Sequence, residues 1–377
     1  MEGLELSFDG HCLRLDTSED AEVICREFQG KEIKKLILQG NTFGIEAAKR
    51  IGQELAKQKF LREAHFKDIF TSRGKEVVPI ALDHLLTGIS QSGTELTLLD
   101  LSDNAIGPIG APSVEKFLRT KAASKIEKLY INNCGMGPEG GALISVPISQ
   151  LRLKEFICGR NRLENKGSQF MYAALSQMKT LEVVRMPQNG INVTGITDLA
   201  RAFMKNISTL RVIDLSDNTI KTKGAEALER VVAGAHNLGE LKLDDALLGN
   251  EGFSIICDAI SRSNNFNTLK LASFEGNEIC GPKIVDLIQL TFKDFAADFM
   301  LDLLENDFTR EELTSLQSMV DSGEVNLQVD DPEDQDYQST DDDDDGDDND
   351  SEGTDYKGSE PVSHNSTVLN SFDKLEI

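Results

Sequence analysis

The sequence contains no tryptophan and only four tyrosines, and aromatic residues make up 6% of its 377 residues. No apolar run approaches the roughly 20 residues that a membrane-spanning helix needs. The amino terminus, Met-Glu-Gly-Leu-Glu-Leu, has neither the basic segment nor the apolar segment of a secretory signal. We therefore expect neither a membrane protein nor a secreted one.

Cysteine pairs and catalytic motifs are also missing. The six cysteines never form a Cys-x-x-Cys pair, which favours reduced thiols in a cytosolic or nuclear protein. The five histidines are isolated, and no P-loop, HExxH or GxSxG motif occurs. Residues 135–140 fit GxGxxG, but related glycine loops recur at 107–110, 190–195 and 249–252, so we interpret them as repeat loops. We expect no metal site and no cofactor of the chain's own.

The net charge of -25 is concentrated at one end. Residues 311–377 hold 22 Asp and Glu against two Lys, which leaves the first 310 residues at about -5. Nucleic-acid binding would need a basic face, and the sequence gives no sign of one. Residues 330–355 contain 15 acidic residues and no basic one, a composition that cannot bury enough apolar surface to fold. We predict a disordered acidic tail over 321–377, whose last stretch, 368–377, is either a docking peptide or simply the chain end.

An internal repeat organises the rest of the chain. The pattern L-x-x-L-x-L-x-x-N/C-x-L recurs at intervals of 27 to 35 residues. Its Asn/Cys position, here called the slot, falls at Asn41, Ile69, Asn104, Cys134, Asn161, Asn189, Asn218, Ala246, Asn277 and Asn306. In the ninth unit, both Leu269-Lys-Leu271 and Ala272-Ser-Phe274 could supply the strand. The period leaves room for a full helix in each unit.

Each element of the pattern has a mechanical meaning. Alternate leucines point inward from a short strand, and the slot asparagine can bond backbone groups of neighbouring turns. One unit cannot bury its apolar face, but a stack can. The pattern predicts an α/β leucine-rich-repeat horseshoe of the ribonuclease-inhibitor type over 1–320, with ten to eleven repeats, parallel inner strands and outer helices. Residues 1–30 are expected to form a cap, with a hairpin over Leu4 to Leu15.

The loop segments are more specific than the repeat. Residues 69–79, with Phe-Thr-Ser-Arg at 70–73, resemble the Phe-Thr-Gly-Arg segment of Ran GTPase-activating proteins, with Ser72 in place of the usual glycine. Residues 101–107, 131–137, 159–165 and 186–192 resemble further segments of that family, in the same order and in consecutive repeats. The resemblance covers residues 1–320 and extends to the acidic tail.

The resemblance implies a GTPase activator for the nuclear-transport GTPase Ran, not an enzyme with a substrate of its own. Ran-GTP is the implied partner and carries the nucleotide, the magnesium ion and the glutamine that orients the attacking water. A Ran-binding protein is a further candidate partner. We expect a monomer that binds neither nucleic acid nor membrane and is cytoplasmic or perinuclear. The alternative is a non-catalytic scaffold or inhibitor on the same horseshoe.

The implied site lies on the rim where the strands end. Arg73 is a candidate arginine finger, a device that gains on the order of 10³–10⁵ in rate. The family is described as acting without a finger, by ordering the GTPase's own glutamine, and Arg73 would then serve docking or local structure. Asn133 matches the family's Asn that reaches toward the active site. The partner-binding candidates are Lys75, Asp103, Asn104, Arg160, Asn161 and Arg162.

One departure from the family concerns its length. Animal members resembling this body continue past the acidic stretch into a folded domain that tethers them to nuclear pores. The present sequence stops at Ile377 and resembles the shorter fungal layout. Pore attachment by that route is therefore not expected.

Overall fold

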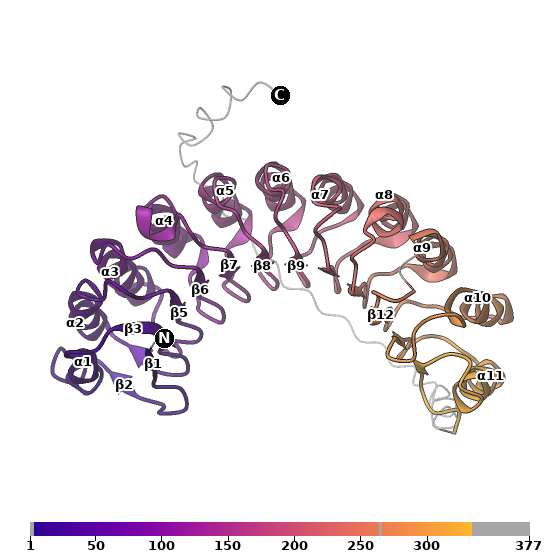
Figure 1. Cartoon of the computed structure of the whole chain (residues 1–377), viewed down its shortest axis with the longest axis horizontal. Coiled ribbons are helices and arrows are strands. Elements are labelled where there is room, and N and C mark those ends of the chain that lie inside the picture. Colours follow the sequence, from indigo (N-terminus) through magenta and orange to yellow (C-terminus); the bar gives the residue numbers. More distant parts are fainter. Residues whose placement is uncertain (1–3, 264–265, 334–377) are drawn as a thin grey trace, which may run out of the picture. The chain divides into compact units, whose positions relative to one another are not determined.

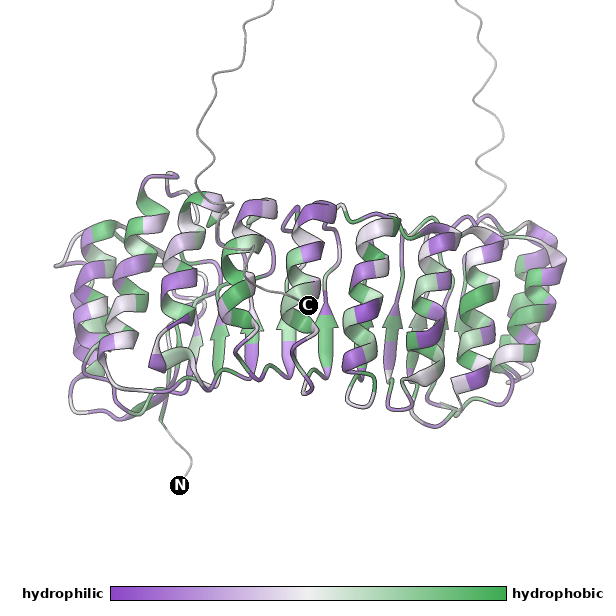
Figure 2. Cartoon of the chain, turned by 90° about the horizontal axis from the view of Figure 1, so that it is seen from above, coloured by the Kyte–Doolittle hydropathy of each residue, from purple (hydrophilic) through white to green (hydrophobic). Residues whose placement is uncertain are grey.

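The computed structural model describes residues 4–263 and 266–333. In this part, the chain repeats one unit of strand, loop and helix, and successive units stack into a curved body (Figure 1). The helices form one layer over a second layer of side-by-side strands (Figure 2). The α/β solenoid predicted from the repeat is thereby confirmed, with its strands inside and its helices outside.

Within the described residues, a parallel sheet of twelve strands runs through the whole body in the order β1-β3-β5-β6-β7-β8-β9-β10-β11-β12-β13-β14. Its strands are β1 Leu4–Ser7, β3 Ile33–Ile37, β5 Glu63–His65, β6 Leu98–Asp100, β7 Lys128–Tyr130, β8 Glu155–Ile157, β9 Val183–Arg185, β10 Val212–Asp214, β11 Glu240–Lys242, β12 Leu271–Ser273, β13 Met300–Asp302 and β14 Leu327–Gln328. A separate parallel pair joins β2, Arg14–Leu15, to β4, Thr42–Phe43.

One helix follows most strands and covers the sheet. The helices are α1 Glu22–Phe28, α2 Ile45–Leu55, α3 Val77–Gln91, α4 Gly107–Leu118, α5 Gly137–Ile148, α6 Glu164–Leu175, α7 Val193–Lys205, α8 Lys221–Gly234, α9 Gly249–Ser263, α10 Pro282–Phe292 and α11 Arg310–Asp321, with a 3-10 turn η1 at Lys121–Ala123. Gly52 and Gly88 let α2 and α3 approach closely, because a Cβ at either would lie within 2.4 Å of a carbonyl oxygen of the other helix.

A continuous core lies between the two layers. In β3 and in β5 to β13, each strand points one central residue inward, and these residues are paired in register from strand to strand and are at most 1% exposed: Leu36, Ala64, Leu99, Leu129, Phe156, Val184, Ile213, Leu241, Ala272 and Leu301. Burying a side chain such as Leu stabilises the fold by about 1.5–3 kcal/mol. The pairing therefore fixes the register of every repeat.

The slot asparagines form a second, polar spine. The Nδ2 group of Asn104 donates to the Phe66 and Leu101 carbonyls at 2.8 Å, and its Oδ1 accepts from the Ile69 amide at 2.9 Å. Asn277 and Asn306 repeat this arrangement near the other end. Where the slot is Cys134, its thiol lies 3.2 Å from the Leu101 carbonyl oxygen. Apart from the bond from Asn104 to Leu101, which lies within one repeat, these bonds join neighbouring repeats, as the sequence pattern predicted.

The strand pairing corrects one expectation and resolves another. The prediction of an N-terminal hairpin is wrong, because β1 pairs in parallel with β3 and β2 pairs in parallel with β4. Two adjacent strands of a hairpin would have to run antiparallel. In the ninth repeat, Ala272 aligns with Leu241, so the inward residues are Ala272 and Phe274.

The boundary expected at 321 lies too early. Val325 and Leu327 are buried, and β14 pairs with β13. The repeat body therefore continues to at least residue 333. The predicted disorder of the remaining tail falls on residues 334–377, outside the described part of the chain.

The remaining global features concern thiols and membranes. All six cysteines are free, as predicted from their spacing. None of the helices found in residues 4–263 and 266–333 combines the length and the apolar character needed to cross a bilayer.

Candidate functional site on the strand-end rim

A row of left-handed residues marks the rim where the strands end. In successive repeats, the residue just before the slot has a positive φ: Gly40, Asp68, Asp103, Asn133, Arg160, Gln188, Asp217, Asp245, Gly276 and Glu305. The backbone amides bond the next repeat, as in Asp103 to the Asn132 carbonyl and Asn133 to the Gly159 carbonyl, both at 2.8 Å. This backbone fixes the row on one edge.

The loop of the fifth slot carries unusual backbone strain. Arg160, Arg162 and Glu164 have φ values of 53°, 53° and 55°. The equivalent loop one repeat earlier places Gly135 and Gly137 at the latter two positions. Bulky residues are uncommon in this conformation, and such strain collects at functional sites. Both arginines are exposed and have no ion-pair partner among the described residues, so their charges face solvent.

Asn133 is exposed on the rim, as predicted, and is not isolated there. Its Nδ2 donates to the Oδ1 of Asp103 at 2.9 Å. The other oxygen of Asp103 lies 3.1 Å from the Nζ of Lys67, and this hydrogen bond raises the pKa of Lys67. Three consecutive repeats thus contribute one side chain each to a connected group. Lys67 was missed in the sequence, although its place two residues before the slot could have indicated it.

Arg73 does not occupy the exposed position expected for a finger. Its side chain is 8% exposed and forms an ion pair with Asp16. It also donates to the hydroxyl of Thr42 at 2.9 Å, to the Thr42 carbonyl at 3.0 Å and to the Leu15 carbonyl at 3.4 Å. These groups belong to β2, β4 and their loops. Arg73 therefore holds the N-terminal cap, which corrects the expected free rim position. Asp16 and Thr42 were not anticipated.

Two predicted partner contacts are buried instead. Asn104 is 1% exposed and Asn161 is fully buried. Their amides are used by the slot bonds between repeats. Their burial contradicts a partner-binding role, because a partner cannot reach these atoms. Lys75, by contrast, is exposed in the loop before α3.

A hollow beside Asn133 extends the site onto the sheet. It measures about 290 Å³, and its lining includes Lys67, Asp103, Tyr130, Asn132 and Arg185. The Tyr130 hydroxyl bonds the carboxylate of Glu155 on the next strand. Burial and this bond raise the pKa of Tyr130. Sequence reasoning missed the hollow because its residues come from six separate repeats.

The rim becomes acidic toward the carboxyl terminus. The segments 215–220, 243–248, 274–281, 303–309 and 329–333 contain no Lys or Arg, and their acidic residues are Asp217, Asp244, Asp245, Glu275, Glu278, Glu305, Asp307, Asp330, Asp331 and Glu333. Partial burial, together with neighbouring carboxylates, raises the pKa values of Asp245 and Glu275. The end of the rim therefore favours a basic partner surface.

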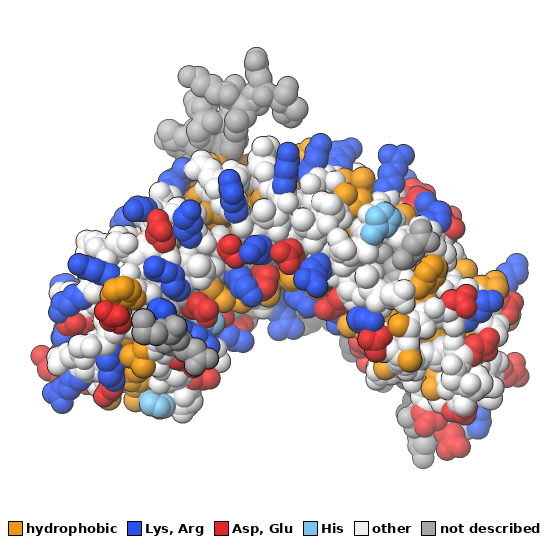
Figure 3. Space-filling model, in the orientation of Figure 1, with side chains coloured by type: hydrophobic (Ala, Val, Ile, Leu, Met, Phe, Trp, Pro, Cys, Tyr) orange, Lys and Arg blue, Asp and Glu red, His pale blue; other side chains and the backbone are white. Residues whose placement is uncertain are grey.

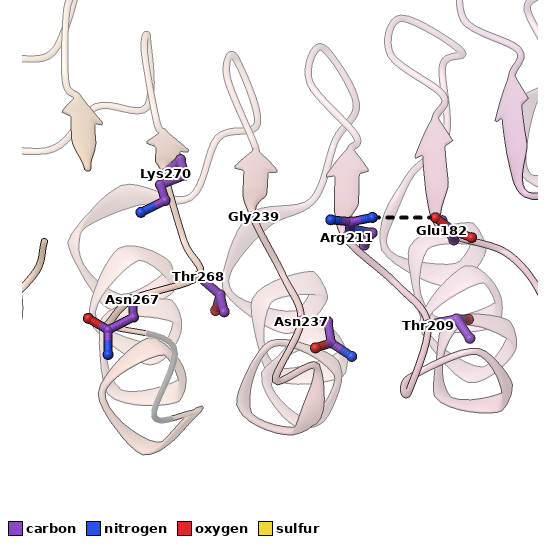
Figure 4. Close-up of a pocket in the computed structure, with 8 residues that line it drawn as sticks. All are labelled: Glu182, Thr209, Arg211, Asn237, Gly239, Asn267, Thr268 and Lys270. Carbon is purple, nitrogen blue, oxygen red and sulfur yellow. Dashed lines mark ion pairs between the residues drawn. The ribbon is translucent and has the colours of Figure 1, made fainter. Parts of the chain in front are cut away.

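The opposite rim offers different features. An open groove of about 640 Å³ lies where β9 to β12 begin, and Arg211 there pairs with Glu182 at 3.7 Å (Figure 4). None of the predicted site residues lines it. On the face seen in Figure 3, charged side chains of both signs are interspersed with small apolar areas. That face shows no large apolar docking patch.

No group of three or more His, Cys, Asp or Glu in the described residues has the arrangement of a metal site. The rim instead offers hydrogen-bonding and charged groups at regular intervals. Such a surface suits recognition of a protein more than chemistry on a small molecule.

Comparisons with known proteins agree with the repeat. Residues 94–112 and 206–228 match a family model described as Leucine Rich repeat. Ran GTPase-activating protein 1 of Saccharomyces cerevisiae is 32% identical over 290 residues, which cover 72% of this chain and 70% of the yeast protein.

Two animal proteins are more similar over a shorter stretch. Ran GTPase-activating protein 1 of Xenopus laevis is 42% identical over 200 residues, covering 50% of this chain and 34% of the frog protein. Ran GTPase-activating protein of Drosophila melanogaster is 37% identical over 213 residues, covering 53% and 36%. The matched part of this chain thus spans about a third of the length of these animal relatives.

Proposed function

The chain belongs to the Ran GTPase-activating protein family, and on this basis we propose that it stimulates GTP hydrolysis by the small GTPase Ran. The observation that carries the proposal is the exposed Asn133, in the middle of the strand-end rim between Asp103 and Arg160. Ran would bind along this rim and bring the nucleotide and the magnesium ion.

Under this proposal, Asn133 is the residue that reaches the active site of Ran, and Arg73 is not. An arginine finger must extend from the surface of its own protein into the partner's active site. Releasing Arg73 would break its bonds to Asp16, Thr42 and Leu15. Asn133 is already exposed and needs no such rearrangement. It would hold the catalytic glutamine of Ran in place, so that the gain comes from positioning, which is worth several kcal/mol in well-oriented systems.

Charged rim residues would supply the docking contacts. Arg160 and Arg162 present charges beside Asn133 that have no ion-pair partner in the described part of the chain, and Lys75 lies near the N-terminal end of the same rim. The acidic segments toward the other end would meet a basic area of Ran. Such pairs raise the rate of encounter more than the final affinity.

The test is GTP hydrolysis by purified Ran with a trace of the full chain. We expect many turnovers for each activator molecule, and no effect on a Ras-like GTPase. The Asn133→Ala variant should lose most of the stimulation while unfolding at an unchanged temperature. Equal stimulation of unrelated GTPases, or full activity of Asn133→Ala, would refute the proposed role.

Binding without acceleration would favour the alternative, a non-catalytic scaffold or inhibitor. In that case the chain would lower the hydrolysis rate or leave it unchanged at saturating concentration. Titration of Ran-GTP with the chain, followed by both binding and hydrolysis, separates these outcomes.

The proposal extends to partners and location. We propose that the chain acts as a cytoplasmic or perinuclear monomer, and that a Ran-binding protein can occupy Ran at the same time. Light scattering of the free chain tests the monomer. Hydrolysis assays with and without a Ran-binding protein test whether one is needed.

A further inference from the structure

The hydrogen bond between Asn133 and Asp103 determines which end of the Asn133 amide faces a partner. An ionised carboxylate accepts hydrogen bonds and cannot donate them. The nitrogen of the Asn133 amide must therefore face the Oδ1 of Asp103, at 2.9 Å. The oxygen of the amide is left pointing away, without a hydrogen-bond partner among the described residues.

Asp103 is itself held from the opposite side. The Nζ of Lys67 lies 3.1 Å from its second oxygen, and the side chain of Asp103 is only 31% exposed. Both Asp103 and Asn133 have left-handed backbone conformations, with φ of 58° and 53°, which set the directions of their side chains. Elsewhere along the described rim, no two neighbouring side chains of the left-handed row share a hydrogen bond.

We propose that Asp103, held by Lys67, is a positioning residue that makes Asn133 a hydrogen-bond acceptor toward its partner. This inference rests on the proposed function and deepens it. The group that Asn133 contacts must then be a donor, such as the amide nitrogen of a glutamine side chain. A glutamine bound in this way turns its own carbonyl oxygen elsewhere, where it can accept a hydrogen bond from water. Asp103 itself would not touch the reacting atoms.

The kinetic test uses Asp103→Asn, which keeps the shape but can face Asn133 with either end of its amide. We expect kcat for stimulated hydrolysis by Ran to fall roughly ten- to hundredfold, the size of effect that misorientation produces, with little change in KM. In the Asn133→Ala background, the same substitution should cause no further loss. Lys67→Met should cause a smaller loss, which disappears in the Asp103→Asn background.

The matched control is Asp83→Asn on α3, which removes a pair with Lys116 at 2.9 Å on the outer helices. It should leave both kinetic constants unchanged. Unfolding temperatures of all variants check that the fold is intact. A loss from Asp103→Asn that persists in the Asn133→Ala background, or that appears in KM, would overturn the proposal, because Asp103 would then contact the partner directly.

A second readout does not involve Ran. The side-chain amide signals of Asn133 can be identified by NMR as those that vanish in Asn133→Ala. In the unchanged chain they should show a hydrogen-bonded amide proton, and in Asp103→Asn they should shift toward values for a solvated asparagine. Identical signals in both chains would refute the fixed orientation. If this arm succeeds and the unchanged chain fails to stimulate Ran, the proposed function has failed and the orientation stands.

Discussion

The guanidinium of Arg73 is bonded to the carboxylate of Asp16, which lies 57 residues earlier in the chain. The same side chain reaches two backbone carbonyls and one hydroxyl of the cap. Arg73 was expected on the rim as a site residue, but its contacts give it a structural role in the cap. A loss of activity on its replacement would therefore have an indirect cause.

Replacing Arg73 by Ala should loosen the N-terminal cap. Charged hydrogen bonds contribute about 1.5–3 kcal/mol, so we expect a loss of about 2 kcal/mol. Amide hydrogen exchange should accelerate in β2 and β4, while repeats beyond α4 stay protected. Asn133→Ala serves as the comparison and should leave exchange in the cap unchanged. Unaltered exchange in Arg73→Ala would show that the cap does not depend on this side chain.

Acid should release the same cap. The hydrogen bond from Arg73 lowers the pKa of Asp16 below its ordinary value of 3.8. The contribution of this pair is therefore present above pH 3.8 and is lost as the pH falls through the lowered pKa. Exchange in β2 and β4 should rise over that acidic range, and Asp16→Asn should abolish this part of the pH dependence. A rise of equal size in Asp16→Asn would assign it to other carboxylates.

Removing a slot asparagine should cost stability and spare the rim. Asn218 accepts from the Asn189 and Ile191 amides at 3.2 and 3.0 Å and donates to the Met186 and Leu215 carbonyls. Unsatisfied buried groups cost about 1–3 kcal/mol each, so Asn218→Ala should lose roughly 3 kcal/mol in urea unfolding. Lys223→Ala, an exposed change on α8, is the control. Equal midpoints for the two variants would contradict the role of the slot.

Neutralising acidic residues at the carboxyl-terminal end of the rim should raise stability but slow association with Ran. The raised pKa values of Asp245 and Glu275 mean that their ionised forms are disfavoured in the folded chain. Any stability linked to these groups is present at low pH and lost as the pH rises through the raised values. Asp245→Asn with Glu275→Gln should therefore raise the unfolding temperature at pH 7 and slow association with Ran at low salt. Faster association would indicate that this end repels Ran.

The end of the repeat body can be tested by two truncations. Ending the chain at residue 333 keeps β14, whereas ending it at 320 removes the buried Val325 and Leu327 and uncovers β13. Only the second should lower the unfolding temperature. The first removes 15 acidic residues and should slow association with Ran at 0.1 M salt but not at 1 M, where the screening length falls from about 10 to about 3 Å. Salt-independent association rates in both chains would limit the tail to solubility.

The repeat made most of the fold predictable. Inward leucines and slot asparagines are local patterns, and stacking converts them directly into the sheet and its polar spine. The cap was harder, because strand direction is decided by partners: β1 joins β3, and no local signal distinguishes that from a hairpin. The ninth repeat stayed ambiguous in sequence because both candidate pairs alternate equally well.

The site was predictable in place but not in detail. Slot counting put Asn133 and Arg160 on one rim, and both lie there. It could not show that Arg73 turns back to Asp16, because that contact depends on the path of a loop. Arg185 illustrates the same limit: it bonds Glu240, 55 residues away and two strands along, with two hydrogen bonds of 2.7 and 2.8 Å.

The left-handed row places one rim side chain per repeat at a regular spacing. Adjacent strands lie about 4.8 Å apart, so Arg160 lies one strand spacing from Asn133 and two from Asp103. A substitution changes the side chain at one position but not the spacing, whereas insertion or removal of a whole repeat would move every later rim residue by one spacing without disturbing any loop. Two chains with the same rim residues in a different order would thus fold alike and recognise different partners.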